Sequence, residues 1–234
     1  MLNAKVPVRA ALIDLDGTLF DTVDDITAAA NAMLADAGRA PLGRDLVAAY
    51  VGKGAAHFVG RALAVAPQAQ ADATEIERWL PVFLAHYHVC NGRRAVMFPG
   101  VAEGLHAMRE LGLRLAVVTN KPRSLTLDLL EQFGVAECFR AVVAGGDTEK
   151  RKPDPEPLLR AFDLLRVTPH EAVMIGDSIN DVQAARAADC RVLVVPYGYN
   201  EGGSVQALAS DGIVATLLEA ADYIRTTQSR NAHV

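Results

Sequence analysis

The sequence predicts an α/β fold, a doubly wound parallel sheet core with a small all-helical domain inserted after its first strand. Three observations indicate this. Short apolar runs rich in β-branched residues alternate with amphipathic segments over most of the chain, as in parallel sheets that are covered on both faces. One long section near the N-terminus shows helical periodicity only. Polar and acidic residues directly follow several apolar runs, where ligands bind in open α/β sheets.

The expected strands are nearly continuous apolar runs, which indicates strands buried on both faces of a Rossmann-like sheet. They are Val8–Leu15, Leu113–Thr119, Arg140–Ala144, Ala172–Gly176 and Arg191–Val195, with a weaker one near Gly212–Ala215. The expected helices are Val101–Leu111, Ser124–Phe133, Pro155–Arg166, Ile179–Ala188 and Ala215–Arg225. We expect residues 226–234 to fray, because chain ends are often poorly ordered.

Residues 22–93 show only helical periodicity, as in DITAAANAMLADAG and TEIERWLPVFLAHYHVC. Connections between strands and helices are usually short, so about seventy helical residues between the first two strands predict an inserted domain. The sequence MFPG at Met97–Gly100 marks the return to the sheet. We therefore predict an α/β catalytic core of residues 1–21 and 94–234 and a helical cap domain of residues 22–93.

The composition is typical of a soluble globular protein: 234 residues, 51% hydrophobic and 22% charged, with a formal net charge of −5. This charge argues against binding to nucleic acid or to anionic membranes. No apolar run approaches the ~20 residues of a membrane span, and we expect no signal peptide. Cys90, Cys138 and Cys190 stand far apart, which favours free thiols in a reducing cytoplasm. We expect a monomer or a homodimer.

Polar side chains follow or connect four of the expected strands, and the carboxyl ends of parallel strands lie at one rim of a sheet. They are Asp14, Asp16, Thr119, Asn120, Lys121, Lys152, Asp177, Ser178 and Asp181. Carboxylates as close in sequence as Asp14 and Asp16 repel each other and lose solvation when buried. They therefore indicate a hard cation such as Mg²⁺, which takes oxygen ligands and completes its octahedron with water and substrate phosphate.

The spacing excludes two common sites and favours phosphoryl transfer to a carboxylate. The DLDG turn lacks the glycine and glutamate positions of an EF-hand, and no GxxxxGK[ST] sequence follows a strand. Aspartate can act as a covalent nucleophile. Asp16, two residues after Asp14 on an extended backbone, can lie on the same side and exchange protons with the leaving group and with water. Thr119, the backbone amide of Asn120 and Lys152 can then hold the phosphoryl oxygens.

Four ordered motifs resemble those of the haloacid dehalogenase superfamily of phosphatases: DLDGTLFD, TN, KPDP and GDSINDVQAA. The helical section resembles that superfamily's small cap. Other segments are most similar to bacterial phosphoglycolate phosphatases, namely VGKGAAHFVGRAL, AGGDTEKRKPDPEPLL, GDSINDVQAARAA and PYGYNEG. The resemblance implies a Mg²⁺-dependent hydrolase of a small phosphomonoester, 2-phosphoglycolate, through an aspartyl-phosphate.

The resemblance also implies residue roles. Asp14 is the expected nucleophile and a Mg²⁺ ligand, and Asp16 the general acid/base with its backbone carbonyl on the metal. Thr119 and Lys152 are expected to bind the phosphoryl group. Asp177 is an expected Mg²⁺ ligand.

Two further expectations concern Asp181 and the cap. The resemblance makes Asp181 a supporting carboxylate at the metal. Gly52 and Lys53 occupy the cap loop with which such enzymes read the leaving group. The glycines on both sides of Lys53 also suggest a close backbone approach.

Structural interpretations compete at other positions. Asp21 precedes VDDITAAA and is interpreted as a helix cap. Lys150 and Arg151 are interpreted as surface charge, whereas Pro153 and Asp154 fix Lys152 locally.

Three alternatives from the same superfamily or another class stay open. A β-phosphoglucomutase-like enzyme would return the phosphoryl group to a sugar, and a phosphonoacetaldehyde hydrolase would use Lys53 as a Schiff base. A receiver-like switch would also phosphorylate an aspartate. Asp16 argues against the switch, because it would speed hydrolysis of the phosphoaspartate.

Overall fold

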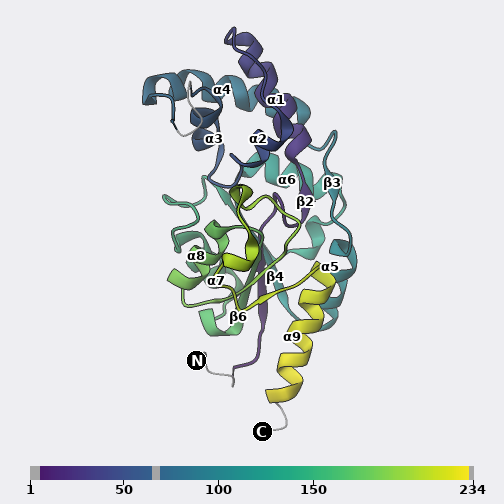
Figure 1. Ribbon diagram of the computed structural model, residues 1–234. Helices are drawn as coiled ribbons and strands as arrows, with labels where there is room; N and C mark the ends of the chain where they lie inside the picture. The colour runs from purple at the N-terminus through teal and green to yellow at the C-terminus, as the bar shows by residue number, and fades with distance from the viewer. Residues whose placement is uncertain (1–5, 65–68, 232–234) are drawn as a thin grey trace.

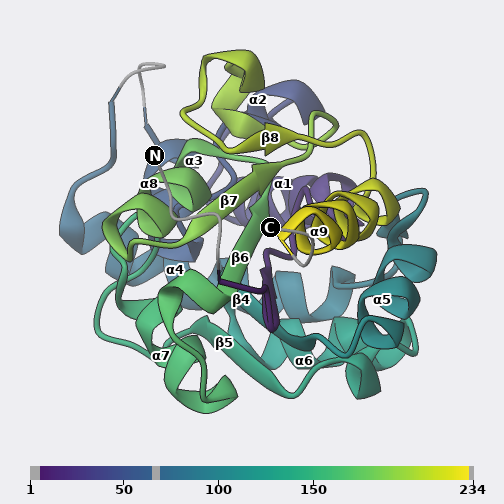
Figure 2. The same cartoon turned by 90° about the horizontal axis from the view of Figure 1, so that it is seen from below.

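The computed structural model describes residues 6–64 and 69–231. Its centre is a six-stranded sheet in the order β5-β4-β1-β6-β7-β8 (Figures 1 and 2), and all its paired strands are parallel. The strands are β1 (Ala10–Ile13), β4 (Arg114–Pro122), β5 (Ala141–Gly145), β6 (Ala172–Gly176), β7 (Arg191–Val194) and β8 (Gly212–Ile213). The predicted doubly wound α/β fold class is confirmed.

Helices cover both faces of this sheet. They are α5 (Val101–Glu110), α6 (Arg123–Gln132), α7 (Glu156–Leu165), α8 (Ile179–Ala187) and α9 (Leu217–Asn231). Figure 2 shows α5, α6 and α9 on one face and α7 and α8 on the other. Successive β1 residues point to opposite faces: Ala11 and Ile13 join the apolar cluster under the first group, Ala10 and Leu12 the cluster under the second. Single-turn 3₁₀ helices lie at Ala136–Cys138, Pro169–Glu171, Asn200–Gly202 and Val205–Ala207.

Four helices stand over the carboxyl ends of the strands (Figure 1). They are α1 (Val23–Asp36), α2 (Arg44–Ala48), α3 (Ala55–Ala62) and α4 (Ala73–Cys90). They pack around an apolar cluster, to which Leu125 of α6 also belongs. The ring centroids of Phe58 and Phe83 lie 5.1 Å apart in this cluster. Most of the buried apolar side chains of the helical segment are therefore packed against one another and not in the two clusters of the sheet.

Two of the contacts between this helical segment and the sheet core lie where the chain passes from one to the other. The short strands β2 (Phe20–Asp21) and β3 (Val96–Met97) pair antiparallel, so the chain leaves and returns at one place. The buried Asp25 carboxylate accepts hydrogen bonds from the backbone N–H groups of Gly92, Arg94 and Ala95. These bonds fix the start of α1 against the returning chain.

Several boundaries differ from the expectations. Strand β1 is shorter than expected, and β4 continues beyond Thr119 to Pro122. The expected fraying of the C-terminus was wrong up to Asn231, because α9 extends to that residue and Gln228 Nε2 donates a hydrogen bond to the Val8 carbonyl at 2.7 Å. Residues 232–234 lie outside the described residues. In the described ranges, no helix is both long and apolar enough to cross a membrane.

Candidate active site

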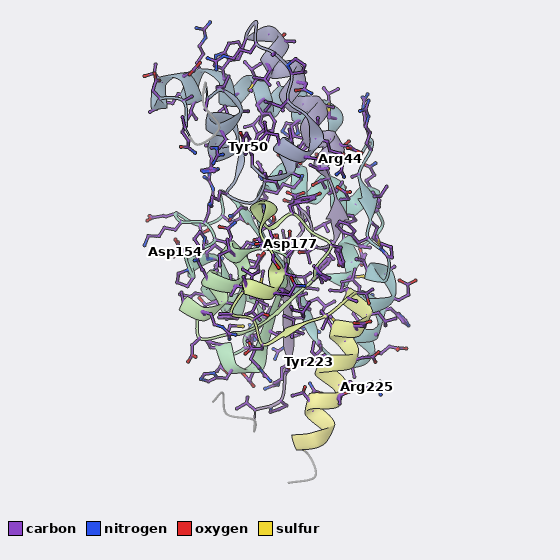
Figure 3. All side chains as sticks on the ribbon, viewed as in Figure 1. Arg44, Tyr50, Asp154, Asp177, Tyr223 and Arg225 are labelled. Carbon is purple, nitrogen blue, oxygen red and sulfur yellow. The ribbon has the colours of Figure 1, made fainter. Side chains whose placement is uncertain are left out.

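Three aspartates gather at the carboxyl ends of β1 and β6. One carboxylate oxygen from each of Asp14, Asp177 and Asp181 lies within 4.8 Å of the other two, and all three residues are buried. Figure 3 shows Asp177 at the boundary between the sheet core and the helical segment to which Arg44 and Tyr50 belong. The strand ends thus bring together acidic residues that are more than 160 positions apart in the sequence.

Close packing of backbone against carboxylate makes this arrangement possible. Gly17 has φ +87°, and a Cβ atom there would lie 2.5 Å from Asp177 Oδ2. A Cβ atom at Gly176 would lie 2.3 Å from Asp181 Cγ. Any larger residue at either position would collide with an acidic side chain, so both glycines are needed for the site.

Two of the aspartates are already held by hydrogen bonds. Asp177 accepts from the Thr18 hydroxyl at 3.1 Å and from the Tyr199 backbone N–H at 2.7 Å. Asp181 Oδ2 accepts from the Ser178 backbone N–H and hydroxyl at 3.1 and 2.8 Å, as a capping box of α8. Their orientations are therefore fixed before any ligand binds.

Lys152 supplies the positive charge of this cluster. Its Nζ lies 2.8 Å from Asp14 Oδ1 and 2.7 Å from Asp181 Oδ1. Burial opposes its charge, but the two carboxylates outweigh burial and raise the pKa of Lys152. The side chain of Asn120 holds the Lys152 backbone through two hydrogen bonds, of 3.0 Å to the N–H and 2.8 Å to the carbonyl. Lys152 is thus a fixed cation beside Asp14.

The acidic cluster has the properties of a site for a divalent cation. Burial raises the pKa of Asp14 to about 7, with Lys152 opposing and Asp181 adding to the rise. Burial, then Asp181 and Asp14, raise the pKa of Asp177 to about 8. Asp14 Oδ1 accepts no hydrogen bond from the described residues, although the Lys152 ammonium is close. Buried, mutually repelling carboxylate oxygens fit Mg²⁺, which prefers such ligands.

Asp16 belongs to a second group of contacts, beside the first. Its Oδ1 accepts from the Thr22 hydroxyl at 2.7 Å and from Lys121 Nζ at 3.1 Å. The Lys121 ammonium also donates to the Tyr87 hydroxyl of α4. The Asp16 carboxylate therefore does not face the acidic cluster, which leaves its predicted metal contact to the backbone carbonyl.

Asp14 of the acidic cluster and Asp16 of the second group line one cavity between the sheet core and the helices. Its core wall is formed by Asp14, Asp16, Thr119, Asn120, Lys121 and Pro122. Its helical wall is formed by Ile26, Val51, Gly52, Gly54, Ala55, Phe58, Phe83 and Tyr87. The cavity measures about 50 Å³, room for roughly four water molecules.

The predicted cap loop divides between two places. Gly52 and Gly54 line the cavity, and the Gly52 carbonyl accepts a 2.8 Å hydrogen bond from Asn120 Nδ2. Lys53 lines a separate, more open pocket with Lys150 and Arg151. This position gives no support to a Schiff base formed by Lys53 beside Asp14.

The interpretation of Asp21 as a helix cap needs refinement. The N-cap residue of α1 is Thr22, while Asp21 Oδ1 accepts from the Val23 N–H at 3.3 Å. Asp21 also pairs with Arg44 of α2 at 2.8 Å and accepts from the Tyr199 hydroxyl at 2.8 Å. Asp21 thus joins the helical segment to the core outside the cavity.

Sequence reasoning placed Lys121 at the rim of the sheet but assigned it no role in the site. It is buried and lies two positions after Thr119 on β4, and residues two apart on a strand point to the same side. The signal was hidden because the strand was expected to end at Thr119. Tyr87 and Thr22 were also missed, since their contacts with Lys121 and Asp16 arise only from the packing of the helices on the core.

The comparisons with known proteins agree with this geometry. A family model described as haloacid dehalogenase-like hydrolase matches residues 11–195. The chain is 43% identical to the phosphoglycolate phosphatase of Nitrosospira multiformis, over 96% of this chain and 99% of that one. It is 45% identical to the plasmid phosphoglycolate phosphatase of Cupriavidus necator, over 93% of each. The crystal structure of a predicted phosphoglycolate phosphatase from Haemophilus somnus has a TM-score of 0.86 at 28% identity, covering 92% of this chain and 97% of that one.

Proposed function

The chain belongs to the haloacid dehalogenase-like hydrolase family, and we propose that it is a Mg²⁺-dependent phosphatase that hydrolyses 2-phosphoglycolate to glycolate and phosphate. One observation carries the proposal. Asp14 and Asp16 line the same narrow cavity, and the buried Asp14 Oδ1 lies beside the fixed Lys152 cation. The phosphoglycolate phosphatases named among its relatives support the choice of substrate.

In the first step, an Asp14 oxygen bonds to phosphorus while the bond from phosphorus to the glycolate oxygen breaks. Asp16 gives its proton to that departing oxygen, so glycolate leaves as a neutral hydroxyl at that end. In the second step, Asp16 takes a proton from a water molecule that attacks the phosphorus. The bond to Asp14 breaks, phosphate leaves, and both carboxyl groups return to their starting states.

Lys152 and Thr119 hold the phosphoryl oxygens in this proposal. The Lys152 ammonium lies beside Asp14, where negative charge is greatest as the phosphoryl group moves. The two hydrogen bonds from Asn120 keep the Lys152 backbone in place. Thr119 lines the cavity next to these groups.

The metal ligands of the proposal are Asp14, the Asp16 backbone carbonyl and Asp177. When bound, Mg²⁺ supplies positive charge to the phosphate and to the carboxylates. Asp181 supports the site in this proposal, with one oxygen held by Lys152 and the other by Ser178.

Residues 22–93 act as a cap over residues 1–21 and 94–234 in the same proposal. The separate apolar cluster of the helices supports this. So do the contacts of Gly52 with Asn120 and of Tyr87 with Lys121 across the cavity. Closure of the cap would keep bulk water from the phosphoryl group during the first step. We also propose a cytoplasmic location, since Cys90, Cys138 and Cys190 are free thiols.

The test is phosphate release from a panel of phosphomonoesters, with Mg²⁺ and with EDTA. The panel contains 2-phosphoglycolate, β-glucose 1-phosphate, phosphonoacetaldehyde and p-nitrophenyl phosphate. We expect metal-dependent turnover with kcat/KM highest for 2-phosphoglycolate. Equal activity on all compounds would defeat the substrate assignment, and β-glucose 6-phosphate formed from the sugar phosphate would indicate a mutase. Turnover that is unchanged in EDTA would defeat the role of the metal.

A further inference from the structure

Lys121 is a buried cation whose presence the reaction chemistry above does not explain. Its side chain is 1% exposed, and it lines the cavity that holds Asp14 and Asp16. Its Nζ is 3.1 Å from Asp16 Oδ1, and it lies 4.4 Å from the centroid of the Tyr87 ring. A buried ammonium group is costly unless an anion and hydrogen bonds compensate for lost water. A binding partner in the cavity would explain why this ammonium group is buried there.

Asp16 is a shared partner for this cation. The Asp16 Oδ1 atom that faces the Lys121 ammonium also accepts a 2.7 Å hydrogen bond from the Thr22 hydroxyl. The other carboxylate lining the described cavity, Asp14, is paired with Lys152. An anionic group on the substrate would give the Lys121 ammonium a further partner inside the cavity.

The geometry fixes which part of a substrate Lys121 can meet. Asp16 must reach the ester oxygen of the leaving group to protonate it, and Lys121 is hydrogen-bonded to that same carboxylate. The group next to Lys121 is therefore the part of the substrate that begins one carbon beyond the ester oxygen. In 2-phosphoglycolate the carboxylate stands at this point, separated from the ester oxygen by one methylene.

We propose that Lys121 binds the carboxylate of 2-phosphoglycolate and so selects short carboxylated phosphomonoesters. Tyr87 is the positioning residue, because its hydroxyl and ring hold the ammonium from the helical side. The side chains of Ile26, Phe58 and Phe83 on the helical wall carry no groups that could form hydrogen bonds with sugar hydroxyls. This inference rests on the proposed function and adds the residue that reads the substrate.

The test compares 2-phosphoglycolate with isobutyl phosphate, in which a CH(CH₃)₂ group of similar shape replaces the carboxylate. The quantity measured is the ratio of kcat/KM for the two substrates. Removing one partner of a buried charge pair is costly, so Lys121→Met should lower this ratio by at least about 30-fold. Lys121→Arg should retain more of the ratio than Lys121→Met. Tyr87→Phe should lower it by about fivefold, since only the hydroxyl contact with the ammonium is lost.

Controls separate this inference from the proposed function. Lys150→Met removes an exposed lysine paired with Asp154 and should leave the ratio unchanged.

A wild-type enzyme that does not prefer 2-phosphoglycolate would defeat the proposed function itself. A wild-type preference with equal losses on both substrates in Lys121→Met would overturn only the role of Lys121. If Lys121→Met does not fold, an unchanged ratio in both Lys121→Arg and Tyr87→Phe would overturn it instead. A loss of the ratio in Lys53→Met, with none in the Lys121 variants, would move carboxylate recognition to the cap loop.

Discussion

The two walls of the cavity differ in chemistry and in construction. The core wall carries charged and hydrogen-bonding groups at the ends of β1 and β4, already joined in networks around Lys152 and Asp16. The helical wall is mainly apolar and comes from α1, α3, α4 and the loop before α3. The contrast supports the proposal that the core performs the phosphoryl transfer, whereas the helical wall limits the size and polarity of what is attached to the phosphate.

The largest expected effect comes from the core wall. Asp14→Asn should reduce phosphate release by at least about 10³-fold, because the amide is a poor nucleophile and the proposed covalent step is lost. The reduction should be similar for every phosphomonoester tested. Asp154→Asn is the matched control, since Asp154 lies at the outer edge of the core (Figure 3) and pairs with Lys150. Retained turnover in folded Asp14→Asn would exclude Asp14 as the nucleophile.

Asp16→Asn should have the next largest effect, a loss of roughly 10²–10⁴-fold in kcat, because both proton transfers depend on this carboxyl group. Activated esters with good leaving groups need less protonation. The loss should therefore be smaller for p-nitrophenyl phosphate than for 2-phosphoglycolate in pre-steady-state measurements of leaving-group release. Equal losses in that first step would argue that Asp16 acts on the fold and not on the leaving oxygen.

The helical wall should change selectivity more than rate. Phe83 is buried between Phe58 and Tyr87 and lines the cavity. Phe83→Leu enlarges the cavity, so the preference for 2-phosphoglycolate over the bulkier glycerol 2-phosphate should fall by about three- to tenfold. Phe162→Leu removes a ring from the core beneath α7 and should leave that preference unchanged. A uniform loss of activity in Phe83→Leu would contradict a selective role for this wall.

The smallest expected effect is a fall in the thermal stability of the folded protein as the pH rises. The folded-state pKa values of Asp14 and Asp177 are about 7 and about 8, above the ordinary 3.8. The stability that these groups contribute is therefore complete below about pH 4 and is lost as the pH rises through 7 and 8. In EDTA, Tm should fall by a few degrees between about pH 6 and about pH 8.5.

Two additions sharpen that measurement. Saturating Mg²⁺ should reduce the fall in Tm, because a bound cation stabilises the ionised carboxylates. Asp177→Asn should flatten the dependence in EDTA, since it removes one of the titrating groups. A Tm that rises with pH in EDTA, in the wild type and in Asp177→Asn alike, would contradict the electrostatic account of the cluster.

The core wall could be predicted well from the sequence because its residues sit beside strong strand signals. Asp14 and Asp177 follow apolar runs directly, and the parallel topology alone places such residues at one rim. The α/β fold class and the family expected from the four motifs are confirmed. The individual residue roles and the domain boundaries stay predictions.

The helical wall could not be predicted in the same way. Its side chains come from three helices whose periodicity says which face is apolar but not where the helices sit on the core. One wrong strand boundary was enough to hide the role of Lys121. Because β4 was expected to end at Thr119, the sequence did not show that Lys121 lies on the same side of the strand as Thr119. Lys53 shows the converse, because glycines on both sides predict a close backbone approach, and it is Gly52 and Gly54 that line the cavity.

The roles proposed for both walls of the cavity depend on covalent phosphorylation of Asp14. We would mix the enzyme with Mg²⁺ and 2-phosphoglycolate, stop the reaction in acid within the first turnover, and locate any phosphoryl group on the digested chain by mass spectrometry. The predicted result is a phosphoryl group on the peptide that contains Asp14, present in the wild type and missing from Asp14→Asn. Release of phosphate without any phosphorylated peptide, or a phosphoryl group on another residue, would contradict the mechanism.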